Sequence, residues 1–256
     1  MRIMIPTISQ EMTLLLAPKM AGPGFATMPD GNWQSLSGLA IGQTLAIGGE
    51  AAFRISGTGW LELNGTRKPF PQLEALRPLP AGEYDCAAQR PGWSLASITL
   101  SDKGWDGLRE DTAGPLILET LRGWLTVGYH QGFLIPDDLG LCRGLVAKLA
   151  LIDKYSLIVT TGGTGLSPRD VTPQAVEPLL DLRLPGFSGA MLARSLEKTV
   201  NAAISRQVCG VIGNALFISL PGSAKAVREN LEAIAGAINH ALAKINGDEA
   251  DCGGSN

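Results

Sequence analysis

A short apolar run that ends in glycines constrains the fold of this chain more than any other feature. Residues 155–161, YSLIVTT, are bulky or β-branched and predict a strand buried on both faces. The run leads directly into the segment 162–165, GGTG, where glycine permits positive φ angles and close approach of the backbone to a ligand. Asp170 then precedes a predicted helix start, with Thr172 as the N-cap and Pro173 at the first helical position.

This strand–loop–helix segment has the chemistry of an anion-binding site. Thr160, Thr161 and Thr164 supply hydroxyl groups, consecutive amides in a glycine turn can line a concave anion site, and a helix N-terminus favours negative charge. Two common phosphate motifs do not fit. No Lys-Ser/Thr pair follows the glycines as in a P-loop, and Pro168 stands where the dinucleotide fingerprint requires glycine. A glycine turn that only reverses the chain is the alternative interpretation.

Strands and helices alternate through residues 91–256, which predicts an α/β fold. The predicted strands are 94–100, 126–135, 155–161 and 215–220, and the predicted helices are 112–124, 139–152, 223–245 and two that follow Pro173 and Pro185. Asp111 is expected to cap the first of these helices. We expect a three-layer α/β/α sandwich around a mostly parallel sheet, with the ligand beyond the carboxyl ends of the strands.

Residues 1–90 are rich in glycine and proline and have a different pattern. Short alternating apolar runs at 45–47, 51–55 and 60–63 are separated by glycine-containing turn signals at 48–49, 57–59 and 64–65. This pattern predicts a small β-rich domain of uncertain role. The segments 77–82 and 90–92, each with an Arg-Pro pair, predict a linker. We therefore expect two domains, residues 1–90 and residues 91–256.

Charge and composition favour a small-molecule ligand. The formal net charge is −3 and no basic cluster occurs, so we expect no nucleic-acid partner. No apolar stretch reaches the ~18 residues that span a bilayer and no leader-peptide pattern occurs, so we expect a cytoplasmic protein without a membrane partner. Two histidines make a histidine-rich metal site or a Ser-His-Asp triad hard to build. The cysteines lack metal-site spacing and are expected to be buried or uninvolved: Cys86, Cys142, Cys209 and Cys252.

The segment 160–173, TTGGTGLSPRDVTP, resembles the signature of the molybdopterin adenylyltransferase family of the MogA/MoaB type. Further matches follow in family order: Ser101-Asp102-Lys103, Asp111, Gly114, Leu134-Ile135-Pro136-Asp137, Pro185-Gly186-Phe187, Ser205-Arg206-Gln207, Leu220-Pro221-Gly222-Ser223 and Lys225. Residues 1–90 lie outside the resemblance. It implies a molybdopterin-binding fold and Mg²⁺- and ATP-dependent adenylylation of molybdopterin, which yields adenylyl-molybdopterin and pyrophosphate. It also implies a homo-oligomer, typically a trimer, and contact with the molybdate-insertion protein.

The resemblance also implies roles for individual residues. Asp137 and Asp170 match the two functional aspartates of the family, which would position Mg²⁺ or orient a pterin nitrogen. One member of the pair Asp137 and Asp138 is expected to be a helix N-cap instead. Ser101 and Asp102 would contact the nucleotide. The residues that would bind molybdopterin are Thr160, Thr161, Gly162, Gly163, Thr164, Gly165, Ser205, Arg206, Pro221, Gly222, Ser223 and Lys225.

Plainer interpretations stand beside these assignments. Ser223 can be an ordinary N-cap beside a surface Lys225, and Arg206 an ordinary surface arginine. Two other functions also remain open at this point: a non-catalytic carrier of the pterin cofactor, and an assembly protein with a degenerate site. Release of pyrophosphate from ATP in the presence of molybdopterin separates the enzyme from both.

Overall fold

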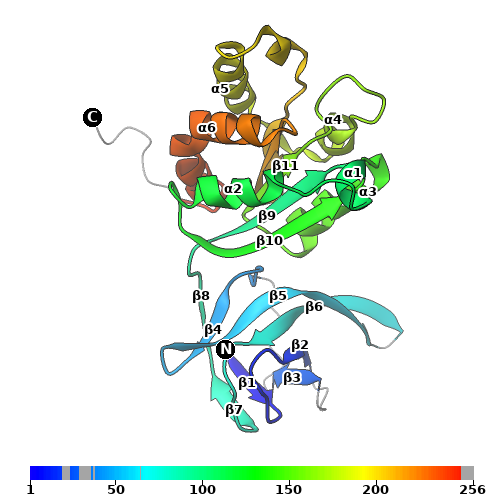
Figure 1. The fold of residues 1–256 in the computed structure, drawn as a ribbon. Helices are drawn as coiled ribbons and strands as arrows, with labels where there is room; N and C mark the ends of the chain where they lie inside the picture. The colour runs from blue at the N-terminus through cyan, green and yellow to red at the C-terminus, as the bar shows by residue number, and fades with distance from the viewer. Residues whose placement is uncertain (19–23, 29–35, 37, 64, 249–256) are drawn as a thin grey trace, which may run out of the picture. The chain divides into compact units, whose positions relative to one another are not determined.

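The structure is a computed structural model of residues 1–256, and it describes all of them except 19–23, 29–35, 37, 64 and 249–256. The chain divides into two compact units, Met1–Trp93 and Ser94–Asn256 (Figure 1). Within the described residues, no helix combines the length and the hydropathy that crossing a membrane requires.

The N-terminal unit is built on one eight-stranded sheet in the order β7-β1-β3-β2-β6-β5-β4-β8. Its strands are β1 Arg2–Ile5, β2 Thr13–Pro18, β3 Phe25–Met28, β4 Thr44–Ile47, β5 Glu50–Leu63, β6 Thr66–Ala75, β7 Gly82–Asp85 and β8 Ala87–Gln89. Neighbouring strands pair antiparallel except β2 and β3, which pair parallel. Phe53, Leu45 and Leu73 are fully buried in a core formed by residues of this unit.

Two details predicted for this unit are wrong. Gly57 and Gly59 do not turn the chain, because β5 runs through them and its pairing with β6 only shifts register after Ile55. A side chain at Gly59 would come within 2.7 Å of Leu15, so glycine allows close packing there. The segment 77–82 is not a linker, because Leu79 pairs with Ile8 and Gly82 begins β7, whereas 90–92 lies between β8 and the division of the two units at Trp93. Asn64, part of another predicted turn, lies outside the described residues.

The C-terminal unit is built on a six-stranded sheet in the order β10-β9-β11-β14-β13-β12. Its strands are β9 Trp93–Leu100, β10 Val127–Ile135, β11 Leu157–Thr161, β12 Leu182–Arg183, β13 Cys209–Ile212 and β14 Ala215–Leu220. The strands β9, β11 and β14 pair parallel, whereas β13 and β12 are antiparallel additions at one side. The sheet is therefore mixed, and the expectation of a mostly parallel sheet describes its centre. The departure arises because Gly213, at a positive φ of 57°, permits a tight turn between β13 and β14.

Helices cover this sheet, which makes the unit an α/β fold (Figure 1). They are α1 Asp102–Trp105, α2 Ala113–Leu121, α3 Leu139–Ala147 with the π-helix η2 Lys148–Ile152, α4 Thr172–Val176 with the 3-10 helix η3 Glu177–Leu179, α5 Pro185–Leu196, the 3-10 helix η4 Val200–Ile204, and α6 Ala224–Ile245. The helix α6 packs against α2 and α5, and α3 packs against α4. Apolar residues recur along α6 at helical spacing, and Val227, Leu231 and Ile238 among them are fully buried.

The register of the central strands brings their carboxyl ends to one edge of the sheet. Thr161 at the end of β11 lies opposite Thr99 on β9 and Leu220 on β14. β10 runs in the same direction as β9 (Figure 1), and the Ser101 amide donates to the Ile135 carbonyl at 3.0 Å where the two strands end. Loops that are far apart in the sequence therefore meet at this edge.

Candidate functional site

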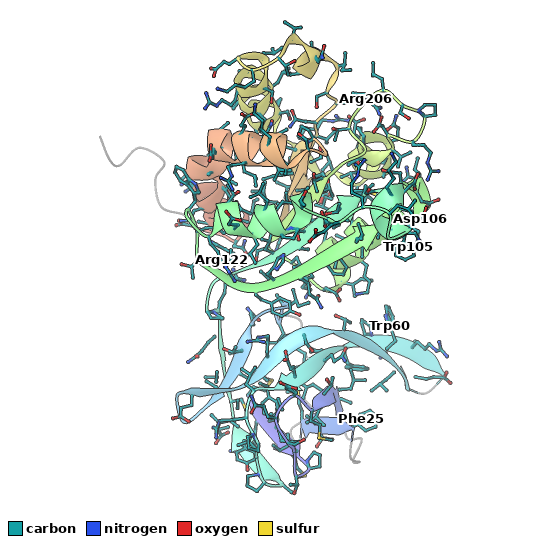
Figure 2. All side chains as sticks on the ribbon, viewed as in Figure 1. Phe25, Trp60, Trp105, Asp106, Arg122 and Arg206 are labelled. Carbon is teal, nitrogen blue, oxygen red and sulfur yellow. The ribbon has the colours of Figure 1, made fainter. Side chains whose placement is uncertain are left out.

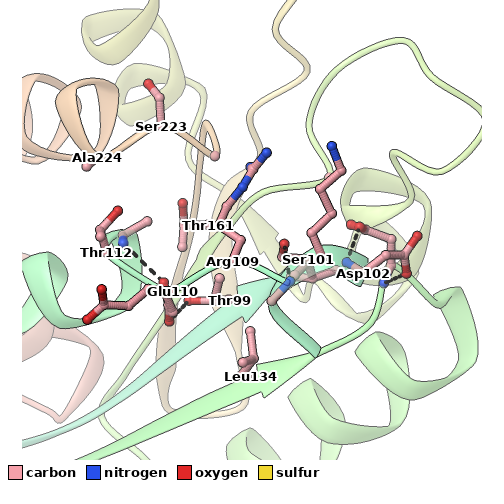
Figure 3. Close-up of a pocket in the computed structure, with 18 of the residues that line it drawn as sticks. Thr99, Ser101, Asp102, Arg109, Glu110, Thr112, Leu134, Thr161, Ser223 and Ala224 are labelled. Carbon is pink, nitrogen blue, oxygen red and sulfur yellow. Dashed lines mark hydrogen bonds between the residues drawn. The ribbon is translucent and has the colours of Figure 1, made fainter. Parts of the chain in front are cut away.

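A cavity of about 560 Å³ lies at the carboxyl ends of the central strands (Figure 3). The backbone of two glycine turns and the side chains of several acidic residues line it. The lining residues are Thr99, Leu100, Ser101, Asp102, Lys103, Gly104, Arg109, Glu110, Asp111, Thr112, Ala113, Leu134, Asp137, Thr161, Gly163, Asp170, Gly222, Ser223 and Ala224. The strand ends predicted to face a ligand therefore do border a cavity.

The first glycine turn follows β11 and requires glycine for two reasons. Gly162 and Gly163 have positive φ angles of 97° and 63°, which other residues rarely adopt. A Cβ atom at Gly162 would also lie 2.3 Å from the Leu100 carbonyl oxygen, and one at Gly163 would lie 2.5 Å from Oγ1 of Thr172. Protein atoms therefore pack tightly against one side of the turn, and Gly163 borders the cavity on the other side.

Thr172 holds this turn in place through hydrogen bonds, and its predicted role as a helix N-cap is wrong. Val171 occupies the N-cap position of α4, without a side-chain cap. The Thr172 hydroxyl instead donates to the Gly162 carbonyl oxygen at 2.8 Å, and the Thr172 amide donates to the Gly163 carbonyl oxygen at 3.0 Å. The Thr172 hydroxyl can reach this carbonyl oxygen because the glycine turn folds back over the start of α4.

The second glycine turn, 221–223, follows β14 and packs against the first. Oγ1 of Thr161 donates to the Pro221 carbonyl oxygen at 2.8 Å, and a Cβ atom at Gly222 would lie 3.4 Å from Cα of Gly162. Ser223 Oγ accepts a hydrogen bond from the Ala226 amide, so Ser223 caps α6 as predicted and also lines the cavity. Two backbone turns and one helix N-terminus therefore converge on the same space.

Two carboxylates face the same cavity as the two glycine turns. Asp137 and Asp170 both line the cavity. Burial raises the pKa of Asp137, and the negative charges of Asp102 and Asp170 act in the same direction. Asp170 is held by its loop, since its Oδ2 accepts a hydrogen bond from the Ser167 amide at 2.7 Å. A cation placed between Asp137 and Asp170 would offset their repulsion.

Asp138, which follows Asp137 in the sequence, is a helix cap. Its Oδ1 accepts a hydrogen bond from the Leu141 amide at 2.8 Å at the start of α3. Asp138 is absent from the residues that border the cavity within the described part of the chain. The choice between these two neighbours is therefore resolved: Asp138 is the N-cap and Asp137 faces the cavity.

Asp102 binds three protein groups in this structure. The Arg169 guanidinium donates to both of its carboxylate oxygens, at 2.6 and 2.9 Å, and holds the pKa of Asp102 below its usual value. The Asp137 amide also donates to Oδ1 of Asp102, and the Asp102 amide donates in return to Oδ2 of Asp137. These bonds tie the turn after β9 to the loop that carries Asp170, a connection between distant loops that sequence reasoning missed.

Arg206 braces the glycine loop from outside the cavity. Its guanidinium donates to the carbonyl oxygens of Gly165 at 2.8 Å and Asp170 at 2.7 Å, and its amide donates to the Thr164 carbonyl oxygen. These bonds use the donors that the sequence assigned to a phosphate or a pterin. In this structure Arg206 therefore positions Asp170 and its loop.

The predicted molybdopterin-binding residues separate into two groups. Four of them border the cavity: Thr161, Gly163, Gly222 and Ser223. The others are not among its lining residues: Thr160, Gly162, Thr164, Gly165, Ser205, Arg206, Pro221 and Lys225. Among these, Lys225 is exposed, whereas the hydroxyl oxygens of Thr160 and Ser205 are buried without a hydrogen-bond partner in the described structure. Both predicted nucleotide contacts, Ser101 and Asp102, border the cavity.

Sequence reasoning missed the role of Thr99. Its Oγ1 donates to Oδ2 of Asp111 at 2.7 Å, and Oδ1 of Asp111 accepts from the amides of Ala113 and Gly114. Asp111 therefore caps the first turn of α2 as predicted, although Thr112 occupies the formal N-cap position. The signal that could have revealed Thr99 is its position at the end of a buried strand, in register with Thr161.

The described cysteines lack the features of nucleophiles. Cys86, Cys142 and Cys209 are buried and form no disulfide. Burial raises their pKa values to about 11, 12 and 11, respectively, so their thiols stay protonated near neutral pH. Cys252 lies outside the described residues.

Comparison with known proteins gives a consistent family relationship. A family model described as "Probable molybdopterin binding domain" matches residues 96–240. The chain is 36% identical over 157 residues to a molybdopterin adenylyltransferase of Helicobacter pylori, and the match covers 60% of this chain and 88% of that protein. It is also 36% identical over 173 residues to gephyrin of Dictyostelium discoideum, where the match covers 64% of this chain and 24% of that protein. The chain thus spans about a quarter of the length of this larger relative.

A solved structure supports the same relationship. The molybdopterin biosynthesis enzyme MoaB of Thermus thermophilus superposes with a TM-score of 0.56 at 40% sequence identity. The superposition covers 60% of this chain and 97% of that chain. The shared part is therefore a complete domain of the relative, and the rest of this chain lies outside it.

Proposed function

Because the chain belongs to the molybdopterin-binding domain family, which includes the molybdopterin adenylyltransferases, we propose that it adenylylates molybdopterin with Mg-ATP and releases pyrophosphate. One observation carries the proposal: two backbone turns and two carboxylates, Asp137 and Asp170, border a single cavity at the carboxyl ends of parallel strands. Backbone amides suit an anionic ligand, and paired carboxylates suit a divalent cation.

The proposed reaction exchanges one phosphorus–oxygen bond for another. An oxygen of the molybdopterin phosphate attacks the α-phosphorus of ATP, and the bond from that phosphorus to the bridging oxygen breaks as pyrophosphate leaves. Catalysis of phosphoryl transfer rests largely on positioning and charge stabilisation. In this chain the turns at Gly163 and Gly222 would hold the molybdopterin phosphate, with the Ser223 hydroxyl beside it, and Ser101 would face the nucleotide.

Magnesium fits the residues present, as a cation shared between protein and substrate. The described residues contain no group of three or more His, Cys, Asp or Glu side chains that would hold a metal alone. Mg²⁺ commonly binds one or two carboxylates, several waters and the phosphates of a substrate. Asp137 and Asp170 would provide that carboxylate pair. When bound, the ion supplies positive charge that neutralises the reacting phosphates.

Pyrophosphate release tests the proposal. Purified full-length protein, molybdopterin and Mg-ATP should release pyrophosphate in proportion to the molybdopterin supplied, and omission of Mg²⁺ should stop the release. Molybdopterin binding without pyrophosphate would support a carrier instead. A protein that binds no molybdopterin would leave only the assembly function or an unrelated activity.

The resemblance also supports the rest of this proposal: a cytoplasmic homotrimer that contacts the molybdate-insertion protein. The compartment, the oligomeric state and the protein partner concern the assembled protein in the cell, whereas the cavity is lined by residues of a single chain. Sedimentation equilibrium of the full chain gives the oligomeric state independently of activity.

A further inference from the structure

The loop between α1 and α2 brings one arginine to the cavity. The amides of Leu108 and Arg109 both donate to the Lys103 carbonyl oxygen, at 2.8 and 3.0 Å, and the Gly107 amide donates to the Gly104 carbonyl oxygen at 3.0 Å. Gly107 has a positive φ of 71°, which allows the chain to turn back at this point. The loop is therefore closed by its own backbone, and the position of the Arg109 backbone is defined.

The Arg109 side chain extends from this loop along the cavity (Figure 3). Among the described residues, no hydrogen bond or ion pair satisfies its guanidinium group. The two other arginines near the site differ from it, since Arg169 is bound by Asp102 and Arg206 by loop carbonyl oxygens. Arg109 therefore keeps its donors available for a ligand.

The charges around the cavity show why an available arginine matters. Its lining includes five carboxylate side chains, those of Asp102, Glu110, Asp111, Asp137 and Asp170, but only two cationic side chains among the described residues, Lys103 and Arg109. The proposed reaction brings two anionic phosphate groups into this acidic surrounding. A guanidinium group binds phosphate through two parallel hydrogen bonds, which a lysine ammonium cannot do.

We propose that Arg109 binds the phosphate chain of the nucleotide, an inference that rests on the proposed function. The nucleotide is the substrate with several linked phosphates, and Arg109 lies on the loop that follows Ser101 and Asp102, the predicted nucleotide contacts. The molybdopterin phosphate has its own site at the glycine turns. Arg109 thus makes the site selective for a nucleotide that carries phosphates, since its guanidinium contacts the phosphates and not the nucleoside.

Calorimetric binding tests this assignment without turnover. The ligands are ATP and adenosine, and the variants are Arg109→Gln, Arg109→Lys and the matched control Arg122→Gln. Arg122 is an exposed arginine at the C-terminal end of α2, outside the cavity lining (Figure 2). Loss of a charged hydrogen-bonding pair should weaken ATP binding by Arg109→Gln about tenfold to a hundredfold. The ATP affinity of Arg109→Lys should lie between those of Arg109→Gln and the wild type, and the ATP affinity of Arg122→Gln should equal that of the wild type. The affinity for adenosine should be the same in all four proteins.

Three results would overturn the assignment: wild-type affinity of Arg109→Gln for ATP, an equal loss of adenosine affinity, or a wild-type protein that binds no ATP. An equal loss of adenosine affinity would mean that Arg109 only supports the loop. Failure of the proposed function gives a different result. In that case ATP binding depends on Arg109, yet the wild type releases no pyrophosphate with molybdopterin. In an active wild type, Arg109→Gln should raise the KM for ATP and leave the KM for molybdopterin unchanged.

Discussion

One residue type takes different roles in a small volume, as shown by Asp137, Asp138 and Asp170. Asp138 accepts a backbone hydrogen bond at the start of α3, whereas Asp137 and Asp170 face the cavity. Burial and two neighbouring negative charges raise the pKa of Asp137, and an Arg169 ion pair lowers the pKa of Asp102. Position relative to the backbone and to charged neighbours therefore distinguishes these carboxylates, since their chemical type is the same.

Replacement of Asp170 by asparagine should separate chemistry from folding. Asp170→Asn keeps an oxygen that can accept from the Ser167 amide, so the loop should keep its shape. The negative charge at the cavity is lost, and turnover should fall about a hundredfold or more. Pyrophosphate release measures the first effect, and the midpoint of thermal unfolding, expected to be nearly unchanged, measures the second.

Asp138→Asn is the matched control for this experiment. It removes the same charge from a residue outside the cavity lining, and asparagine is as good an N-cap as aspartate. We expect wild-type turnover and stability. If Asp170→Asn unfolds at a clearly lower temperature and its activity falls with the folded fraction, Asp170 is a structural residue of the loop.

The start of α2 depends on a glycine that leaves room for a polar cluster. A Cβ atom at Gly114 would lie 2.4 Å from Oδ2 of Asp111 and 2.6 Å from Oγ1 of Thr99. Both atoms are engaged, because Thr99 donates to Asp111 and Asp111 accepts the first amides of the helix. This element therefore joins the end of β9 to the N-terminus of α2 beside the cavity.

Gly114→Ala should destabilise the protein through this cluster. The added methyl group must displace Asp111 or Thr99 from its hydrogen bonds, and overpacking of this kind costs about 1–3 kcal/mol of unfolding free energy. Urea denaturation followed by circular dichroism measures the change.

The control for Gly114→Ala is Gly144→Ala in α3. Gly144 is exposed, and a Cβ atom there meets nothing within 4 Å. Alanine in place of glycine inside a helix should raise stability by about 0.5–1 kcal/mol. Equal stabilities of the two variants would show that the Thr99–Asp111 cluster tolerates the extra methyl group.

At the scale of the whole molecule, the chain consists of two compact units, Met1–Trp93 and Ser94–Asn256. In the described part of the chain, the buried cluster of the N-terminal unit extends from Ile3 to Cys86. Among the described residues, those that line the cavity all belong to the C-terminal unit, from Thr99 to Ala224. Folding of the site should therefore not require the N-terminal sheet.

A protein of residues 94–256 should fold by itself and keep its catalytic activity. We expect cooperative thermal unfolding and pyrophosphate release with the same KM values for ATP and molybdopterin as the full chain, because every cavity residue is retained. Circular dichroism and the pyrophosphate assay provide the two measurements. Aggregation of the fragment, or a raised KM, would show that residues 1–93 support the site.

Strong local patterns made much of the C-terminal unit predictable. The strands 94–100 and 155–161 and the helix 223–245 are confirmed within a few residues, because their apolar periodicity is long or uniform. Strand β13 was missed because it is short and pairs through a turn at Gly213. The glycines at 57 and 59 were misread as turns because sequence alone cannot distinguish a turn from close packing.

The site was predictable as a set of loops and less so as a set of contacts. Asp137, Asp170 and the two glycine turns were expected at strand ends, and the structure brings them to one cavity. The bonds of Arg206 to the glycine loop and of Arg169 to Asp102 were not foreseen. They join residues distant in sequence, and only the folded chain decides which donor meets which acceptor.

The contact between the turns at Gly162 and Gly222 limits how this site can be redesigned. The Thr161 hydroxyl bonds to the Pro221 carbonyl oxygen and Gly222 lies against Gly162, so an insertion in either turn should disturb the other. We therefore expect a change of substrate to leave both turns at their present length. The segment 103–109 is closed by its own backbone hydrogen bonds and, within the described structure, makes no such contact with either turn, so altered specificity should arise there first.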